Sequence, residues 1–340
     1  MSKVIIIAEA GVNHNGDINL AKELIDVAAI AKVDFVKFQT WITEDIVDIS
    51  AEKAEYQKEN DGSNSSQFEM LKRLELSFND FIELKKYSES KGVKFLSTPD
   101  DYKSLDFLSD ELDLPILKIG SGEVTNIPFL RRFGKKRKPI ILSTGMSSIG
   151  EVEKAYYTLI ESGAPSVILL HCTSNYPALL KSVNLKAMNT LKSVFNTDVG
   201  YSDHTEGVEI SFAAVALGAV VIEKHYTLDK KMSGPDHKAS LDPNELIQLV
   251  KGVRNIEQAL EGDGIKKTHL SEFETKKVVQ KGIYLTKNIC EGEIITDDYL
   301  IMKRPVSELS AQDYDFVIGR KVVKNIQEGL ALKLNDINFD

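Results

Sequence analysis

The sequence has few cysteines and no long apolar run. Its two cysteines, Cys172 and Cys290, stand far apart in the 340 residues. They can form neither a disulfide framework nor a cysteine-rich metal site, so we expect a reducing, cytoplasmic setting. The longest apolar stretch, 212–222, is about half of what a bilayer span requires. The N-terminal apolar run, 4–8, is too short for a signal peptide before Glu9 interrupts it, so we expect neither a membrane segment nor export.

Positive charge is also in short supply. The chain has 42 Lys and Arg against 51 Asp and Glu, which gives a formal net charge of −9. This balance argues against a protein that binds nucleic acid through the phosphate backbone. Apolar residues make up 42% of the chain and charged residues 27%, as in an ordinary globular protein. The length fits one large domain followed by a smaller one.

Short β-branched runs alternate with helix-patterned segments over most of the chain. This alternation is typical of repeated βαβ units around a parallel sheet. The eight predicted strands are Val4–Ala8, Phe35–Phe38, Lys94–Leu96, Ile116–Ile119, Ile140–Leu142, Val167–Leu170, Val199–Gly200 and Val220–Glu223. The intervening segments carry apolar faces of helical period, such as Leu20, Leu24 and Val27. We therefore predict an α/β fold, a closed (β/α)8 TIM barrel with its helices on the outside.

A second, smaller domain follows the predicted barrel. The phrase Lys287–Glu293 is repeated at Lys324–Leu330, which indicates duplication of a β-turn element. We predict a barrel over residues 1–262, a linker over 263–280 and a small β-rich domain over 281–340. A domain of about 60 residues has little core of its own. We therefore expect it to dock on the barrel or on a partner chain.

Polar side chains follow nearly every predicted strand. In a (β/α)8 barrel the chemistry lies at the carboxyl ends of the strands, and packing alone does not require so many polar groups there. They are Glu9, Asn13 and His14; Lys37 and Gln39; Ser97 and Thr98; Lys118, Ser121 and Glu123; Ser143 and Thr144; His171 and Thr173; Ser202, Asp203 and His204; and Glu223 and His225. We interpret the polar stretch 46–66 as an extended active-site loop.

His204 and His225 follow neighbouring predicted strands. With Glu9, Asp203 and Asp236 near them, two neutral imidazoles would suit Mn²⁺, Fe²⁺ or Zn²⁺. The alternative is that both histidines only hydrogen-bond the rim of the barrel, because their wide spacing forms no compact ligand motif. The spacing leaves both interpretations open.

Two lysines and two hydroxyl side chains occur on or directly after neighbouring predicted strands. Lys37 and Lys118 supply fixed positive charge, and Thr98 and Ser121 supply hydrogen-bond donors. This is the combination that a phosphate dianion requires. The glycines on either side of Ser121 would let backbone N–H groups approach the same oxygens. The residues therefore predict a phosphate site.

Several ordered motifs together resemble one family. They include Ile7–Gly16 (IAEAGVNHNG), Val36–Thr40 (VKFQT), Lys118–Glu123 (KIGSGE), Tyr201–Thr205 (YSDHT) and Glu223–Asp229 (EKHYTLD). The chain resembles the sialic acid (nonulosonic acid) synthases over essentially its whole length, and its C-terminal part is similar to their antifreeze-like (SAF) domain. Residues 53–57 and 67–71 look most like the bacterial branch that includes the N,N′-diacetyllegionaminate synthases.

The resemblance implies roles for the residues at the strand ends. It implies that phosphoenolpyruvate binds to Lys37, Thr98, Lys118, Ser121 and Ser202. It implies sugar contacts from Gln39, Tyr176, Asp236 and Arg304. It makes His204 and His225 ligands of a divalent metal, Mn²⁺ first, with Mg²⁺ or Co²⁺ as alternatives. Arg304 matches an arginine that the SAF domain inserts into a neighbouring subunit's barrel, which implies a domain-swapped homodimer.

The implied reaction joins phosphoenolpyruvate to the open-chain aldehyde of N-acetylmannosamine, consumes water and releases phosphate by C–O cleavage, which gives N-acetylneuraminate. The alternative acceptor, 2,4-diacetamido-2,4,6-trideoxymannose, would give N,N′-diacetyllegionaminate. We predict that Glu123, or else Glu9, handles the proton of the water. Arg304 completes the predicted catalytic set, and the two lysines of the phosphate site orient the substrate.

Two other functions compete with the synthase. A Schiff-base aldolase on the same barrel would use Lys37, Lys118 or Lys224 as its nucleophile. That chemistry does not explain the cluster of lysines and hydroxyls. A non-catalytic protein would bind glycan or ice through the SAF-like domain, but it would leave the paired histidines and the polar strand ends without a role.

Overall fold

The computed structural model describes residues 3–53 and 65–339. The chain divides into two compact units, Met1–Glu261 and Gly262–Asp340, and each is described by itself. Residues 54–64 of the predicted active-site loop lie outside the described residues, as does most of the segment 53–57.

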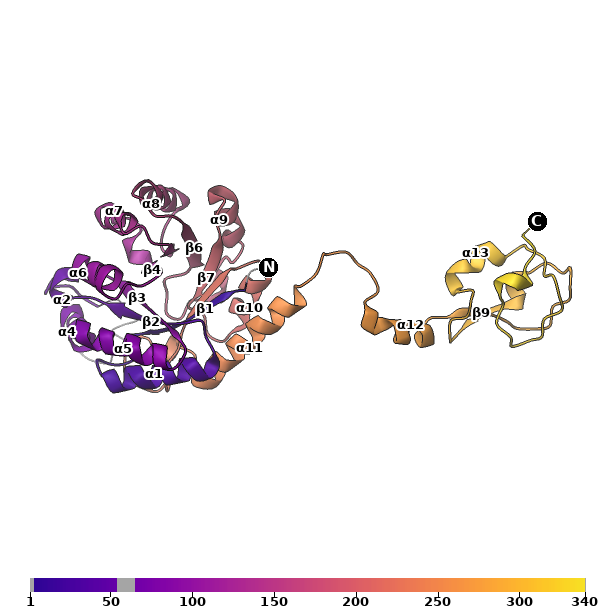
Figure 1. Ribbon diagram of the computed structural model, residues 1–340, viewed down its shortest axis with the longest axis horizontal. Helices are drawn as coiled ribbons and strands as arrows, with labels where there is room; N and C mark the ends of the chain where they lie inside the picture. Colours follow the sequence, from indigo (N-terminus) through magenta and orange to yellow (C-terminus); the bar gives the residue numbers. More distant parts are fainter. Residues whose placement is uncertain (1–2, 54–64, 340) are drawn as a thin grey trace. The chain divides into compact units, whose positions relative to one another are not determined.

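The first unit is a barrel of parallel strands. In chain order these are β1 Ile5–Gly11, β2 Phe35–Thr40, β3 Lys94–Pro99, β4 Leu117–Ile119, β5 Ile140–Ser143, β6 Val167–Cys172, β7 Val199–Asp203 and β8 Val221–His225. Their hydrogen-bonded order is β3-β2-β1-β8-β7-β6-β5-β4, and the two end strands lie against each other. The strands form a nearly closed ring with helices around it (Figure 1). This confirms the predicted (β/α)8 barrel.

Helices cover the outside of the strands. They are α1 Ile18–Ala31, α2 Thr43–Ile46, α4 Gln67–Leu74, α5 Phe78–Ser90, α6 Tyr102–Asp106, α7 Ile127–Lys135, α8 Ile149–Glu161, α9 Ala187–Phe195, α10 Glu209–Ala216 and α11 Pro243–Ala259. Ser77, Ser148 and Asp242 begin α5, α8 and α11 with reciprocal capping boxes, which satisfy backbone N–H groups at the helix start. Apolar faces such as Leu24 and Ala28 of α1 then pack into the common core.

The strands run further toward their carboxyl ends than the apolar pattern predicts. Every strand except β4 continues past the predicted end, for example to Pro99 in β3 and to His225 in β8. The added residues are mostly polar, because the barrel interior changes there from aliphatic core to the wall of a cavity. Polar residues that were expected to follow the strands therefore lie within them.

The second unit is built around its own aliphatic core. Its main pairing is antiparallel, between β9 Gly282–Leu285 and β10 Leu300–Lys303. The core residues are Ile283, Leu285, Ile289, Ile295, Leu309, Val317, Val322, Ile326, Leu332 and Ile337. The unit also contains α13 Tyr314–Val317, and the stretch predicted as a linker contains a short helix, α12 Phe273–Val279, whose residues are exposed.

The two copies of the repeated phrase pair with each other. Ile289 and Ile326 exchange backbone hydrogen bonds of 3.0 and 2.9 Å. The Asn288 side chain accepts from the N–H of Glu328 and the Asn325 side chain accepts from the N–H of Glu291, both at 2.8 Å. The second unit is therefore organised by an approximate two-fold axis, and the duplication suggested by the sequence has a structural counterpart.

Among the described residues, no helix is both long enough and apolar enough to cross a membrane. The cytoplasmic location expected from the sequence stays a prediction.

Candidate active site

A cavity of about 420 Å³ opens at the carboxyl ends of the barrel strands. It brings together most of the side chains predicted as functional. Its lining includes Glu9, Lys37, Gln39, Thr98, Lys118, Ser121, Tyr176, Ser202, His204 and His225. It also includes Gln67, Asp100, Gly120, Gly122, Ser143, Met146, Ser174 and Glu223. The cavity therefore combines cations, carboxylates, hydroxyls and imidazoles, and every strand except β6 contributes to its described lining.

Two lysines and two glutamates form the floor of this cavity. The Lys37 ammonium lies 2.7 Å from Glu9 and 3.7 Å from Glu223, and Lys118 lies 3.6 Å from the other oxygen of Glu223. All four side chains are at most 7% exposed. Charges buried this deeply are costly to the fold unless they are paired. The pairing with the two glutamates offsets part of the cost of burying the lysines.

Burial and neighbouring charge push the two carboxyl pKa values apart. Burial would raise the pKa of Glu223, but Lys118 and Lys37 outweigh this effect and bring it to about 2. Burial raises the pKa of Glu9 to about 7, although Lys37 opposes the rise. At neutral pH, therefore, Glu223 is the fixed anion and Glu9 can exchange a proton.

The lysine pKa values also move in opposite directions. Burial would lower the pKa of Lys37, but Glu223 and Glu9 hold it above its usual value. For Lys118 burial prevails and lowers the pKa, although Glu223 opposes it. The floor is best suited to an anion that adds negative charge beside both ammonium groups.

Hydroxyl groups complete this anion site. Lys37 donates to Thr98 at 3.0 Å, Lys118 donates to Ser143 at 2.7 Å, and Ser202 donates to Glu223 at 3.0 Å. Each hydroxyl is thus held beside a charged group of the floor. The set provides both charge and directional donors for a phosphate or carboxylate.

Gly145 fixes the position of Ser121 on the wall. Its backbone N–H donates to the Ser121 hydroxyl at 3.0 Å. A Cβ at position 145 would lie 2.2 Å from the Ser174 hydroxyl oxygen and 3.0 Å from that of Ser121. Only glycine allows this close approach, so its backbone can orient Ser121 without closing the wall.

His204 is positioned as a neutral ligand. Its Nδ1 donates to the carbonyl oxygen of Thr173 at 2.7 Å, which leaves Nε2 as the acceptor, 3.1 Å from the Tyr176 hydroxyl. Burial lowers the pKa of His204 to about 4. A backbone carbonyl that holds one ring nitrogen is the usual outer support of a metal-ligating histidine.

His225 faces His204 across the wall formed by β7 and β8. The two ring centroids are 5.7 Å apart, and burial lowers the pKa of His225 well below its usual value. Among the described residues its buried Nδ1 has no hydrogen-bond partner, and the nearest carboxylate oxygen, on Asp236, is 3.9 Å away. Two neutral imidazoles, one with an unsatisfied nitrogen, fit a divalent metal. The described residues contain no cluster of three His, Cys, Asp or Glu side chains arranged for a metal, so further ligands would come from water or substrate.

Two predicted site residues of the first unit, Glu123 and Asp236, do not line the cavity. Glu123 accepts from Asn126 at 2.7 Å, and Asp236 lies beside His225, where burial raises its pKa to about 6. Arg304 belongs to the second unit, where it is exposed. Lys224, considered as a Schiff-base nucleophile, is buried but points out of the barrel interior to pair with Asp203 at 3.1 Å.

The structure adds residues to which the sequence assigned no role. Glu223 and Ser143 stood among the polar strand ends, but the structure shows that they hold the two lysines. The sequence could have shown that Glu223 faces the cavity, because it stands two residues before His225 and residues two apart on a strand share a face. Asp100 directly follows β3 and Gln67 is the first residue of α4; both line the cavity, but the sequence assigned neither of them a role.

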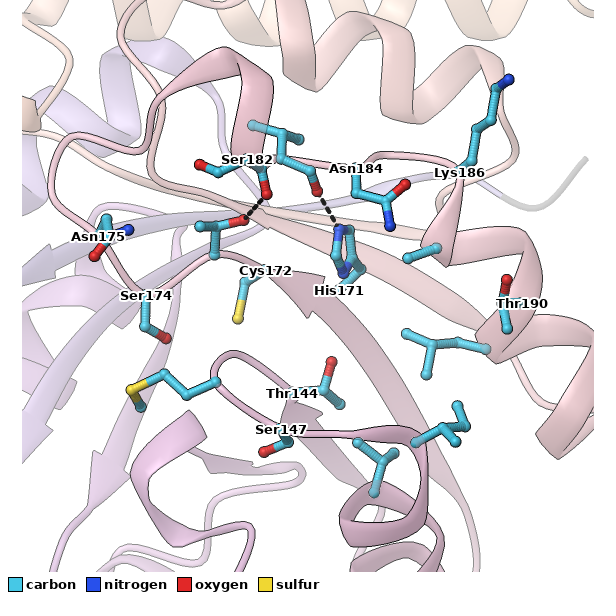
Figure 2. A pocket seen from close by; sticks show the side chains of 17 residues that line it. Thr144, Ser147, His171, Cys172, Ser174, Asn175, Ser182, Asn184, Lys186 and Thr190 are labelled. Carbon is cyan, nitrogen blue, oxygen red and sulfur yellow. Dashed lines mark hydrogen bonds between the residues drawn. The ribbon is translucent and has the colours of Figure 1, made fainter.

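A larger cavity of about 680 Å³ adjoins the first and shares Met146 and Ser174 with it. Its labelled side chains are mostly neutral (Figure 2). His171 forms a hydrogen bond of 2.7 Å with the carbonyl oxygen of Val183. Among the described residues that line the larger cavity, the one charged residue, Lys186, is exposed. The smaller cavity, with its paired charges and imidazoles, is the better candidate for an anionic substrate.

Comparisons with known proteins agree with this geometry. A family model described as the NeuB family matches residues 24–266, and one described as the SAF domain matches residues 280–338. The chain is 50% identical to the N,N′-diacetyllegionaminic acid synthase of Campylobacter jejuni (96% of this chain, 98% of that one) and 45% identical to that of Legionella pneumophila (96% and 92%). It is 36% identical to human N-acetylneuraminate-9-phosphate synthase (95% and 89%).

A solved structure is also similar. The N-acetylneuraminic acid (sialic acid) synthetase from Leptospira borgpetersenii, in complex with citrate, shares 39% identity with this chain and has a TM-score of 0.70. The match covers 81% of this chain and 90% of that one.

Proposed function

Because the chain belongs to the NeuB family of sialic acid synthases and carries a SAF domain, we propose that it condenses phosphoenolpyruvate with the open-chain aldehyde of an N-acetylated mannosamine-type sugar. The product is a nine-carbon α-keto acid, a nonulosonic acid. The observation that carries this proposal is the paired floor of Lys37, Lys118 and Glu223 beside two neutral histidines.

The lysines bind the anionic substrate in this proposal. Lys37 and Lys118 neutralise the phosphate and carboxylate of phosphoenolpyruvate, and Thr98, Ser121 and Ser202 donate to their oxygens. Holding the substrate in one orientation converts an encounter of two molecules into a directed reaction. Glu223 stays ionised and keeps both lysines in place when the site is empty.

The reaction forms one carbon–carbon bond and breaks one carbon–oxygen bond. The methylene carbon of phosphoenolpyruvate bonds to the aldehyde carbon, water supplies the new oxygen on C2, and phosphate leaves with the former bridging oxygen. The two protons of the water end on the new hydroxyl and on the departing phosphate. We assign the first of these protons to Glu9, since its pKa of about 7 suits exchange at neutral pH and it lines the cavity, whereas Glu123 does not.

His204 and His225 are the proposed metal ligands, with Mn²⁺ first and Mg²⁺ or Co²⁺ as alternatives. A divalent cation at this position supplies Lewis-acid polarisation of the aldehyde oxygen. The chain's own part is to present the Nε2 lone pair of His204, which Thr173 fixes, and the unsatisfied Nδ1 of His225.

Two acceptor sugars compete. The relatives from Campylobacter jejuni and Legionella pneumophila, at 50% and 45% identity, are N,N′-diacetyllegionaminic acid synthases, and the human relative at 36% is an N-acetylneuraminate-9-phosphate synthase. These identities favour 2,4-diacetamido-2,4,6-trideoxymannose over N-acetylmannosamine as the acceptor. N-acetylmannosamine remains the second candidate.

The test is phosphate release from phosphoenolpyruvate with Mn²⁺, measured with each sugar and with and without EDTA. We expect release with the diacetamido sugar, its loss in EDTA and its loss in His204→Ala. Unchanged release in EDTA would refute the metal role. No release with either sugar would refute the synthase, and a lysine trapped by borohydride with a keto acid would then support the aldolase.

We also propose that Arg304 acts in a neighbouring subunit of a homodimer. Arg304→Ala and Lys37→Met are each expected to be inactive. If Arg304 serves the partner's barrel, mixing the two variants under exchange conditions restores one native site per mixed dimer. Absence of any restored activity in verified mixed dimers would place Arg304 outside the partner's site.

A further inference from the structure

Asp100 lies near the opening of the active-site cavity. It follows β3 directly, and its backbone N–H donates to the carbonyl oxygen of Thr40 at 3.0 Å. This bond continues the β2–β3 pairing, in which Gln39 lies opposite Thr98. Thr98 and Asp100 both line the cavity, as residues two apart on one face do. Asp100 therefore lies about 6 to 7 Å beyond Thr98 toward the opening.

The carboxylate of Asp100 differs from that of its neighbour Asp101. Asp101 accepts from the backbone N–H groups of Ile42 and Ser104, both at 2.8 Å, and from the Ser104 hydroxyl at 2.5 Å. Within residues 3–53 and 65–339, no side chain or backbone group hydrogen-bonds or ion-pairs with the Asp100 carboxylate. Asp101 thus fixes the loop, while Asp100 presents an acceptor to the cavity.

The charges of the site indicate which of the two substrates contacts the Asp100 carboxylate. Phosphoenolpyruvate is an anion whose place is at the lysines of the floor, and a carboxylate beside it would repel it. Burial raises the pKa of Asp100 to about 7, and the nearby Glu123 adds to the rise while Lys37 opposes it. The substrate group that suits this end of the cavity is therefore neutral and carries hydrogen-bond donors.

The orientation of the sugar follows from the histidines. The aldehyde carbon must lie near His204 and His225, which belong to the β7–β8 side of the ring. β3 lies across the ring from that side in the strand order. The carbons furthest from the aldehyde, together with their substituents, therefore extend toward Asp100.

We propose that Asp100 is a specificity-determining residue that accepts a hydrogen bond from the amide N–H of an acetamido group on the distal part of the acceptor sugar. Gln67, at the start of α4, lines the same cavity and carries an amide that can donate to the acetamido oxygen. A carboxylate with an amide donor matches both halves of an acetamido group. A hydroxyl at that position carries its donor and its acceptor on a single oxygen, whereas the acetamido group carries them on two separate atoms, so the site favours the diacetamido sugar.

This inference rests on the proposed function, so the experiment separates the two. Asp100→Ala and Asp100→Asn are compared with the wild type for kcat/KM with each sugar and for the KM of phosphoenolpyruvate. Asp113→Asn, at an exposed residue that pairs with Lys138, is the matched control. We expect Asp100→Ala to lower the preference for the diacetamido sugar by about tenfold or more, with the KM of phosphoenolpyruvate changed less than about twofold.

The outcomes are distinct. Equal losses with both sugars, or a raised KM for phosphoenolpyruvate alone, would overturn the assignment while leaving the synthase intact. Calorimetric titration with each sugar gives a second measurement that does not depend on turnover. If the wild type bound the diacetamido sugar without turning it over and Asp100→Ala bound it equally well, the assignment would be wrong. Failure of the wild type to bind either sugar would overturn the assignment together with the proposed function.

Discussion

The barrel and the C-terminal unit differ in how many charged side chains they bury. The barrel buries Glu9, Lys37, Lys118 and Glu223 within a few ångströms of one another. Among the described residues of the C-terminal unit, the one buried charged side chain is Asp336, and its core is aliphatic. Buried charges rarely improve stability over apolar packing. The difference shows where the chain keeps charged groups for chemistry and where it uses polar groups only to close turns.

The largest expected effect comes from breaking the charged floor of the barrel. Lys118→Met removes one of two cations from the proposed phosphoenolpyruvate site, and we expect phosphate release to fall by about 10² to 10³-fold. Lys321→Met, an exposed change in the C-terminal unit, is the control. Fluorescence of Trp41, the only tryptophan in the sequence and buried in the barrel, reports whether the fold is intact. Near-normal activity in a folded Lys118→Met protein would contradict the assigned floor.

The second effect tests the aliphatic core of the C-terminal unit. Ile289 is 1% exposed and lies where the two repeated phrases pair, so Ile289→Ala should destabilise this unit by about 3 kcal/mol. Hydrogen exchange resolved by mass spectrometry would show lost protection in residues 282–339. Ile294, which is 49% exposed, provides the matched control in Ile294→Ala. Equal losses of protection in both variants would show that the core is not centred on this pairing.

The third effect is a pH dependence confined to the barrel. Burial lowers the pKa of His14 from 6.5 to about 4, so the folded barrel keeps this ring neutral while the unfolded chain protonates it. The contribution of His14 to the free energy of unfolding is fully present above pH 6.5 and is lost as the pH falls toward 4. At pH 5 the loss from this one residue is about 2 kcal/mol.

His14→Asn isolates this effect. Asparagine keeps an acceptor for the Gly16 N–H, which His14 Nδ1 now accepts at 3.0 Å, but it does not titrate. Between pH 7.5 and 5, urea unfolding followed by Trp41 fluorescence should show about 2 kcal/mol more loss in the wild type than in the variant. Carboxyls with raised pKa, such as Glu9 and Asp236, act in the opposite direction, but they are common to both proteins and cancel. Parallel pH profiles would contradict the prediction.

The smallest effect tests the two-fold symmetry of the C-terminal unit. Asn288→Ala and Asn325→Ala each remove one hydrogen bond to the backbone of the other copy, at the same distance of 2.8 Å. We expect both variants to lose about 1 kcal/mol, with local hydrogen exchange rising at Glu328 in the first and at Glu291 in the second. A large difference between the two losses would show that the copies do not contribute equally.

The sequence predicted the strands well but placed their carboxyl ends too early. The cores of β1 to β8 are apolar on both faces and are easily recognised, as expected for a parallel sheet covered by helices. The apolar pattern stops where the barrel interior becomes the cavity wall, as at Thr98 in β3 and at Glu223 in β8. Because the functional residues at the strand ends are polar, a prediction based on the apolar pattern ends these strands too early.

The motifs identified many of the side chains that line the cavity and missed others, and the roles assigned to them stay predictions. The predicted phosphoenolpyruvate and metal ligands converge on one cavity, whereas Lys224 and His14 of the same motifs do not line it. Spacing could not show that Glu223 holds both lysines, because this depends on three strands being closed into one ring. The sequence could not predict a role for Asp100, for a simpler reason. Two aspartates stand side by side in the sequence, and only the fold shows that Asp101 is satisfied and Asp100 is not.

The reciprocal bonds between the repeated phrases have a consequence for the history of the C-terminal unit. Each copy supplies the backbone and side-chain partners that the other requires, so a single copy would leave those groups exposed to water. This is the pattern of an isologous contact between identical subunits, in which residue i of one copy contacts residue j of the other and residue j contacts residue i. A short ancestral peptide that paired with a second copy of itself would have made these bonds before the two copies were fused into one chain.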